Sequence, residues 1–265
     1  MVNIVSNIGK GTISLCRDII DVLALFFTTV WWIVVGPFIG KASSRQSIFQ
    51  QMVFVGVQSL VIVFFISLFT GIVIAMQSAY QLKQLGAAIY VAPMVSVGMA
   101  RELGPVFTAL IIAGRVGSAI SAELGTMKVS EQIEALETLA LDPVRFLVVP
   151  RVLALLIMMP CLTIISDIVG IVGGSIVGVF SLKLNIYRYL TFSFDMLTWK
   201  DVWTGLAKSV VFGLVISIIS CYVGLKTQGG AEGVGESTTR SVVLSFILII
   251  LVDSILTGLF YFTNM

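Results

Sequence analysis

The chain has 265 residues, of which 11% are charged and 58% are hydrophobic, and its mean hydropathy is +1.07. A soluble domain carries about 25% charged residues, so this chain lacks the polar residues that would cover a soluble fold. It is therefore predicted to be an integral membrane protein. The formal net charge is only +2 and no basic cluster stands out, which argues against a nucleic-acid partner.

Histidine is absent from the sequence, and its absence excludes several kinds of active site. Ser–His–Asp and Cys–His catalysis and histidine-ligated zinc or haem are all impossible. The cysteines Cys16, Cys161 and Cys221 lie far apart and form no CxxC motif. The chain also lacks a P-loop for ATP. We therefore expect no catalytic residue, no metal and no cofactor bound by this chain itself.

The first 45 residues are predicted to form an amphipathic or interfacial region. Val22–Gly40 is uncharged, but Trp31–Trp32 favours the headgroup region and Gly36–Pro37 would interrupt a straight span. Two interpretations remain, a sixth span or a helix lying in the membrane interface. The interfacial one is favoured because a sixth span would separate Lys10 and Arg17 from the other basic residues.

Residues 46–265 are predicted to form one membrane domain with five transmembrane helices. The apolar segments lie at about 52–76, 86–122, 152–180, 202–225 and 241–262, and a spanning helix needs about 20 apolar residues. Lysines and arginines of the connecting segments favour a cytoplasmic N-terminus. The fold class is thus an all-α integral membrane protein, with an interfacial helix, five spans and one short helix between spans.

That short helix is predicted over residues 130–141, a segment too short to cross a membrane. Ser130 is a plausible N-cap, and Asp142–Pro143 would end the helix. One face is apolar and the other polar, with Ile133, Leu136 and Ala140 opposite Glu131, Glu134 and Thr138. We interpret it as an amphipathic helix that is able to dock onto another protein.

Two stripes of small residues and one glycine-rich segment are interpreted as features of packing and chain connection. Small residues recur at four-residue spacing in Gly170, Gly174 and Gly178 and in Gly117, Ser121 and Gly125. Such stripes permit close helix approach, either within one chain or between subunits. The segment Gly229–Gly235 lacks the spacing of a nucleotide-binding loop and is interpreted as a flexible connection.

Six charged residues fall inside the apolar segments: Arg101, Glu102, Arg115, Asp167, Lys208 and Asp253. Charges at such depth are costly and usually face protein or a water-filled cavity. Glu102 and Lys208 are predicted to pair. Gly104–Pro105 would disturb helix hydrogen bonding beside Arg101 and Glu102, which suits a polar cavity or a hinge. The alternative is a set of salt bridges that only holds the helices together.

The stretch Ala100–Ala154 resembles the MlaE/YrbE permease family, the membrane subunits of ABC transporters that move lipids together with MCE-domain proteins. It contains the LGP, AGRxGSA, ExGxM and EQ…DP elements of that family in order. KSVVFGLVIS at 208–217 and GVGESTTRSVV at 233–243 fit the same family. The resemblance extends over about residues 45–265.

The resemblance implies a function and a set of partners. It implies a homodimer in the bacterial inner membrane that moves phospholipid to or from a periplasmic hexamer of MCE-domain subunits and so maintains outer-membrane lipid asymmetry. ATP and magnesium would be bound by a cytoplasmic ABC ATPase, to which a STAS-domain protein binds. Transport direction and headgroup preference stay open.

The resemblance also assigns roles to residues. Lipid binding or gating would involve Arg101, Glu102 and, as a weaker candidate, Arg240. The charges inside the apolar segments, rather than the resemblance, suggest an intramembrane charge network of Arg115, Asp167, Lys208 and Asp253, and an acid at Asp167 departs from the family pattern. The short helix would be the coupling helix that meets the ATPase, through Glu131, Ile133, Glu134, Leu136 and Glu137. Apart from the resemblance, the residues also suit a secondary transporter or channel with a charge relay, or a membrane anchor.

Overall fold

The computed structural model describes residues 2–36 and 44–262, with the backbone alone for residues 2–15. The described residues form helices and short connections, without a strand. The α-helices are α1 (Val2–Val35), α2 (Arg45–Val55), α3 (Leu60–Gln84), α4 (Val91–Gly98), α5 (Gly104–Ile112), α6 (Ser118–Val129), α7 (Gln132–Thr138), α8 (Val149–Phe180), α9 (Ile186–Met196), α10 (Trp199–Leu225) and α11 (Gly230–Phe262).

Five short helical turns interrupt or join these helices. Two are 3₁₀ turns, η1 (Val57–Ser59) and η2 (Ala88–Tyr90). Three are π-helical turns, η3 (Met99–Leu103), η4 (Ala113–Gly117) and η5 (Val144–Val148). Because η3 and η4 continue the helices on either side, α4, α5 and α6 together form one long interrupted segment.

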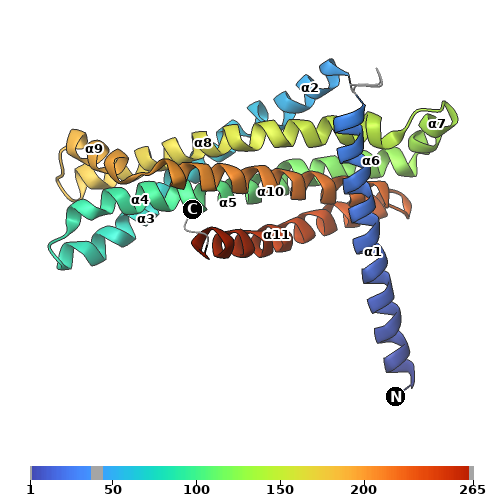
Figure 1. Ribbon diagram of the computed structural model, residues 1–265, viewed down its shortest axis with the longest axis horizontal. Helices are drawn as coiled ribbons and strands as arrows, with labels where there is room; N and C mark the ends of the chain where they lie inside the picture. The colour runs from blue at the N-terminus through green and yellow to red at the C-terminus, as the bar shows by residue number, and fades with distance from the viewer. Residues whose placement is uncertain (1, 37–43, 263–265) are drawn as a thin grey trace.

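Among the described residues, six helical segments are long and apolar enough to cross a membrane: Cys16–Val35, Arg45–Gln84, Ala88–Val129, Val144–Phe180, Trp199–Leu225 and Gly230–Phe262. The last five coincide with the five predicted apolar segments, apart from the first two residues of 86–122. The chain is an all-α, multi-pass integral membrane protein, as the composition predicted. Its long helices lie side by side, with α7 at one end of the bundle and α9 at the other (Figure 1).

Helix α1 is placed differently from the other long helices. Figure 1 shows it crossing the bundle at a steep angle near the end that carries α7. Its apolar residues Val22, Leu25 and Phe26 pack against the main hydrophobic core. Residues 1 and 37–43 of the predicted interfacial region, including Lys41, lie outside the described residues. The described part of α1 thus runs across the long helices rather than along them.

One connection contains a helix that the sequence analysis did not predict, and another differs from its prediction. The polar stretch between the third and fourth predicted spans contains α9, whose first turn is capped by the Asn185 side chain accepting from the Tyr187 N–H. The flexible connection predicted at Gly229–Gly235 is wrong, because α11 already begins at Gly230. Gly229 and Gly230 have positive φ angles, and a Cβ on Gly233 would overlap Gln228 O, so these glycines build a tight turn.

The glycine stripes pack within the chain. A Cβ on Gly71 of α3 would overlap Gly170 O of α8, so the two backbones touch. Gly174 and Gly178 face the buried ring of Tyr189 on α9. The second stripe contacts α10, where a Cβ on Gly117 would lie 2.9 Å from Ser220 Oγ. Small residues therefore let α3 approach α8 closely, and they let η4 and α6 approach α10 closely.

Candidate functional site

Arg101 and Glu102 lie on η3, at the break between α4 and α5. Pro105 has no N–H, so regular α-helical hydrogen bonding fails one turn before it. The Gly104 N–H instead donates to Met99 O, five residues earlier. π-helical turns of this kind are frequent at functional sites. The break predicted from Gly104–Pro105 is thus a widened turn rather than a kink.

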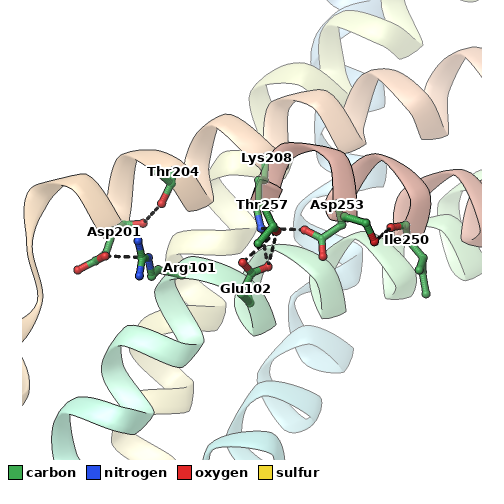
Figure 2. A network of polar contacts seen from close by, with 9 residues as sticks. Arg101, Glu102, Asp201, Thr204, Lys208, Ile250, Asp253 and Thr257 are labelled. Atoms are coloured by element: carbon green, nitrogen blue, oxygen red, sulfur yellow. Dashed lines mark hydrogen bonds and ion pairs between the residues drawn. The ribbon is translucent and has the colours of Figure 1, made fainter. Parts of the chain in front are cut away.

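Glu102 belongs to an ion cluster that joins η3, α10 and α11 (Figure 2). Lys208 Nζ lies 2.5 Å from Glu102 Oε2 and 2.9 Å from Asp253 Oδ1, and it also donates to Thr257 Oγ1 at 2.7 Å. The Lys208 side chain is 1% exposed. The structure contains the Glu102–Lys208 pair expected from the sequence, it places Asp253 of the predicted charge network beside Lys208, and it adds Thr257.

Arg101 points to a different partner on α10. Its Nε lies 2.9 Å from Asp201 Oδ1, and its side chain is 49% exposed. Asp201 also closes the capping box of α10, because its Oδ2 accepts from the N–H and the hydroxyl of Thr198. Arg101 therefore keeps guanidinium N–H groups available while one edge is fixed, as a headgroup contact would require.

Two cavities adjoin these charges. The first, of about 200 Å³, is lined by Arg101, Glu102, Lys208, Thr257 and neighbouring residues of α4 and α11. The second, of about 380 Å³, is nearly all apolar and is lined by Trp199, Lys200, Trp203, Thr204, Ala207 and Phe260. They share Thr204 and Phe260. A cavity with charged residues in its wall thus adjoins an apolar one, an arrangement that suits an amphipathic ligand.

Arg115 is not part of the ion cluster, contrary to the predicted network. From η4 it donates to Phe54 O at 3.0 Å, Ser59 Oγ at 2.7 Å and Gln58 Oε1 at 2.9 Å. These groups surround the break between α2 and α3. Because backbone oxygens at a helix break need donors, Arg115 stabilises that break.

Arg240 and Asp167 are also separate from the cluster. Arg240, near the start of α11, lies 3.3 Å from Asp18 Oδ2 and lines another cavity of about 560 Å³ between α1, α10 and α11. Asp167 lies on α8, where its Oδ1 is buried without a hydrogen-bond partner in the described structure. It packs instead against Gly104, directly after η3.

The short helix α7 is smaller than the predicted helix 130–141. Ser130 is not its N-cap, because the Ser130 hydroxyl donates back to Thr126 O and the residue ends α6. Glu131 has a φ of 58°, which separates the two helices. At the C-terminal end of α7, the Ala140 N–H donates to Glu137 O and the Leu141 N–H donates to Leu136 O. Ala140 has a φ of 57°, as is common in the turn that ends a helix.

The faces of α7 also differ from expectation. Ile133 is 4% exposed and packs into the protein core together with the half-buried Leu136. Ile133 therefore does not fit the predicted contact with an ATPase. The outward surface contains Glu131, Glu137 and Leu139, and Leu139 is 70% exposed. Lys128 donates a hydrogen bond to Glu134 and lowers the pKa of that carboxyl below its usual value.

Some site residues were missed in the sequence analysis, although several of them had a signal. Thr257 follows Asp253 by four residues and so shares its helix face. Thr198 and Asp201 have the spacing of a capping box. Trp199, Trp203 and Phe260 carried no charge and did not stand out in an apolar chain.

Comparison with known proteins agrees with this architecture. A family model described as Permease MlaE matches residues 48–259. A probable ABC transporter permease protein of Rickettsia typhi is 42% identical over 98% of this chain and 99% of its own length. The intermembrane phospholipid transport system permease protein MlaE of Haemophilus influenzae is 35% identical over 98% of both chains. The chloroplastic protein trigalactosyldiacylglycerol 1 of Arabidopsis thaliana is 38% identical over 84% of this chain and 63% of its own. This chain therefore belongs to the MlaE permease family.

Proposed function

We propose that this permease moves phospholipid as the membrane subunit of an ABC transporter. The observation that carries the proposal is the cavity with the charged residues Arg101 and Glu102 in its wall, which adjoins an apolar cavity at Trp203 and Phe260. A headgroup would occupy the first and an acyl chain the second, at a gain of about 0.8 kcal/mol per buried CH₂. The name of the Haemophilus relative, an intermembrane phospholipid transport system permease protein, supports the same substrate.

The proposed assembly follows the family resemblance. Two copies of the chain would lie in the bacterial inner membrane, with α7 and the α1 helix at the cytoplasmic side. A cytoplasmic ABC ATPase, with its STAS-domain protein, would bind ATP and magnesium and dock at α7. A periplasmic MCE-domain hexamer would exchange lipid at the opposite end. The crosswise placement of α1 supports an interfacial position.

The lipid site is tested by Arg101→Ala in the complex with its ATPase, reconstituted in vesicles containing fluorescent phospholipid. A hydrogen bond to a charged group contributes about 1.5–3 kcal/mol, so ATP-dependent lipid transfer should fall about tenfold or more. The complex should still assemble, because Asp201 keeps its contacts with Thr198. Arg188→Ala, at an exposed arginine of α9, is the matched control. Unchanged transfer in Arg101→Ala would refute the proposed site.

Docking at α7 is tested by Leu139→Asp. Leu139 is 70% exposed, so the change should not disturb the core, but it places a charge on the surface offered to the ATPase. Co-purification of the ATPase should fall about tenfold or more, while the permease keeps its unfolding midpoint. Leu136→Asp, by contrast, should also lower that midpoint, because Leu136 packs against the core. Normal ATPase binding by Leu139→Asp would place the docking surface elsewhere.

A further inference from the structure

The C-terminal part of α1 is joined to the segment that follows α7. Trp32 Nε1 donates a hydrogen bond to Asp142 Oδ2 at 2.9 Å. The Arg145 guanidinium lies over the same indole, 5.6 Å from the ring centroid. Trp31, the neighbouring residue, is 61% exposed. One tryptophan of the pair is therefore held by the protein and the other faces outward.

Asp142 lies in the connection between α7 and α8, directly before Pro143 and η5, and is called the joint between these helices below. Its second oxygen, Oδ1, accepts the backbone N–H groups of Val144 at 2.9 Å and Arg145 at 3.4 Å, which fixes the start of η5. On its other side, Leu141 ends the closing turn of α7. One carboxylate thus fixes the path from α7 into α8 and holds α1 to that path.

The other part of α1 is joined to the turn between α10 and α11. Lys226, directly after α10, lies 2.7 Å from Asp18 Oδ1 and 2.9 Å from Asp21 Oδ2. Arg240 of α11 lies 3.3 Å from Asp18 Oδ2. Hydrogen bonds to Asp18, Tyr222 and Asp21 raise the pKa of Lys226, so it stays charged in this cluster. The helices that meet at this turn carry Lys208 and Asp253.

Residues 18–32 of α1 therefore connect two places that are far apart in the sequence. A displacement of α7 must either break the Trp32–Asp142 hydrogen bond or move α1 with it. Hydrogen bonds to a carboxylate are about twice as strong as neutral ones. A rigid helix fixed at both ends is a physical link of the kind that couples distant sites.

We propose that Trp32 is a positioning residue for energy coupling, and that residues 18–32 of α1 tether the joint after α7 to the turn between α10 and α11. When the ATPase moves α7, this tether moves the turn whose helices hold the ion cluster. The inference rests on the proposed function, because it assumes an ATPase at α7 and a lipid site at the cluster. It adds that transmission runs through α1 as well as through α8.

The test compares Trp32→Leu with Trp31→Leu in the complete permease–ATPase complex in vesicles. The readout is the number of ATP molecules hydrolysed for each fluorescent phospholipid transferred, which a merely structural role would not change. Trp32→Leu should raise this ratio at least about fivefold, the lower end of typical coupling between sites. Trp31→Leu should leave it unchanged, and both variants should retain the ATPase.

A second variant keeps the test decisive if Trp32→Leu is poorly folded. Trp32→Phe retains a ring beneath Arg145 but cannot donate to Asp142, so its ratio should lie between those of the wild type and Trp32→Leu. Combined with Asp142→Asn, its effect should be less than additive, because both changes remove the same bond. Equal ratios in the Trp31 and Trp32 variants, or additive effects, would overturn the tether. Wild-type complex without ATP-driven transfer would instead refute the proposed function.

Discussion

Replacing Lys208 with methionine should abolish transport and destabilise the protein. The change removes the cation that lies between Glu102 and Asp253 and leaves two carboxylates facing each other inside the membrane domain. Breaking a buried ion pair by removing one partner costs about 3–5 kcal/mol. The lower value is expected, because the Glu102 side chain is 39% exposed. The measurements are the unfolding midpoint in detergent and ATP-dependent lipid transfer.

A triple variant separates the two roles of this cluster. Lys208→Met, Glu102→Gln and Asp253→Asn together remove all three charges while largely keeping side-chain volume. Because no unpaired charge remains, the unfolding midpoint should return close to that of the wild type. Lipid transfer should stay low, since the cavity keeps the charge of Arg101 but has lost those of Glu102 and Lys208. A stable triple variant that transports normally would show that the cluster only holds helices together.

The membrane segments could be predicted because their residues are apolar over the thickness of a bilayer. The residues at which the helices begin and end could not be predicted in this way, because the helices extend beyond the bilayer and local hydrogen bonding determines where they stop. The start of α11 at Gly230 depends on two positive φ angles and on a close contact at Gly233, and hydropathy detects neither of these features. The same applies to α7, where Glu131 and Ala140 set both ends.

The candidate site was predictable where charge and helix disruption coincide. Arg101 and Glu102 stand beside Gly104–Pro105, and Lys208 supplied the opposite charge. Arg115 was assigned to the same network because hydropathy detects an intramembrane charge but not its partner. Its partners include a backbone oxygen, Phe54 O, at a helix break that no sequence motif marks. Assigning it correctly required knowledge of the break itself.

Gly104→Ala should impair the site from a position that carries no functional group. The added Cβ would overlap Asp167 Oδ1 and would lie 3.0 Å from Met99 O. The overlap forces α5 away from α8 at the residue that ends the π-helical turn of Arg101 and Glu102. Overpacking of this kind costs about 1–3 kcal/mol. Gly114→Ala, whose Cβ meets nothing closer than 3.9 Å, is the matched control and should behave like the wild type.

Asp167 provides the rescue that tests this interpretation. Asp167→Ala removes the overlapping atom, so Gly104→Ala combined with Asp167→Ala should recover most of the unfolding midpoint and of the lipid transfer lost by Gly104→Ala alone. Asp167→Asn alone should be tolerated or slightly stabilising, because it keeps the shape and removes an acid whose buried Oδ1 lacks a hydrogen-bond partner. If the double variant is as impaired as Gly104→Ala, the defect arises elsewhere, for example at Met99 O. If Asp167→Asn abolishes transfer, the carboxyl itself has a role that its packing against Gly104 does not explain.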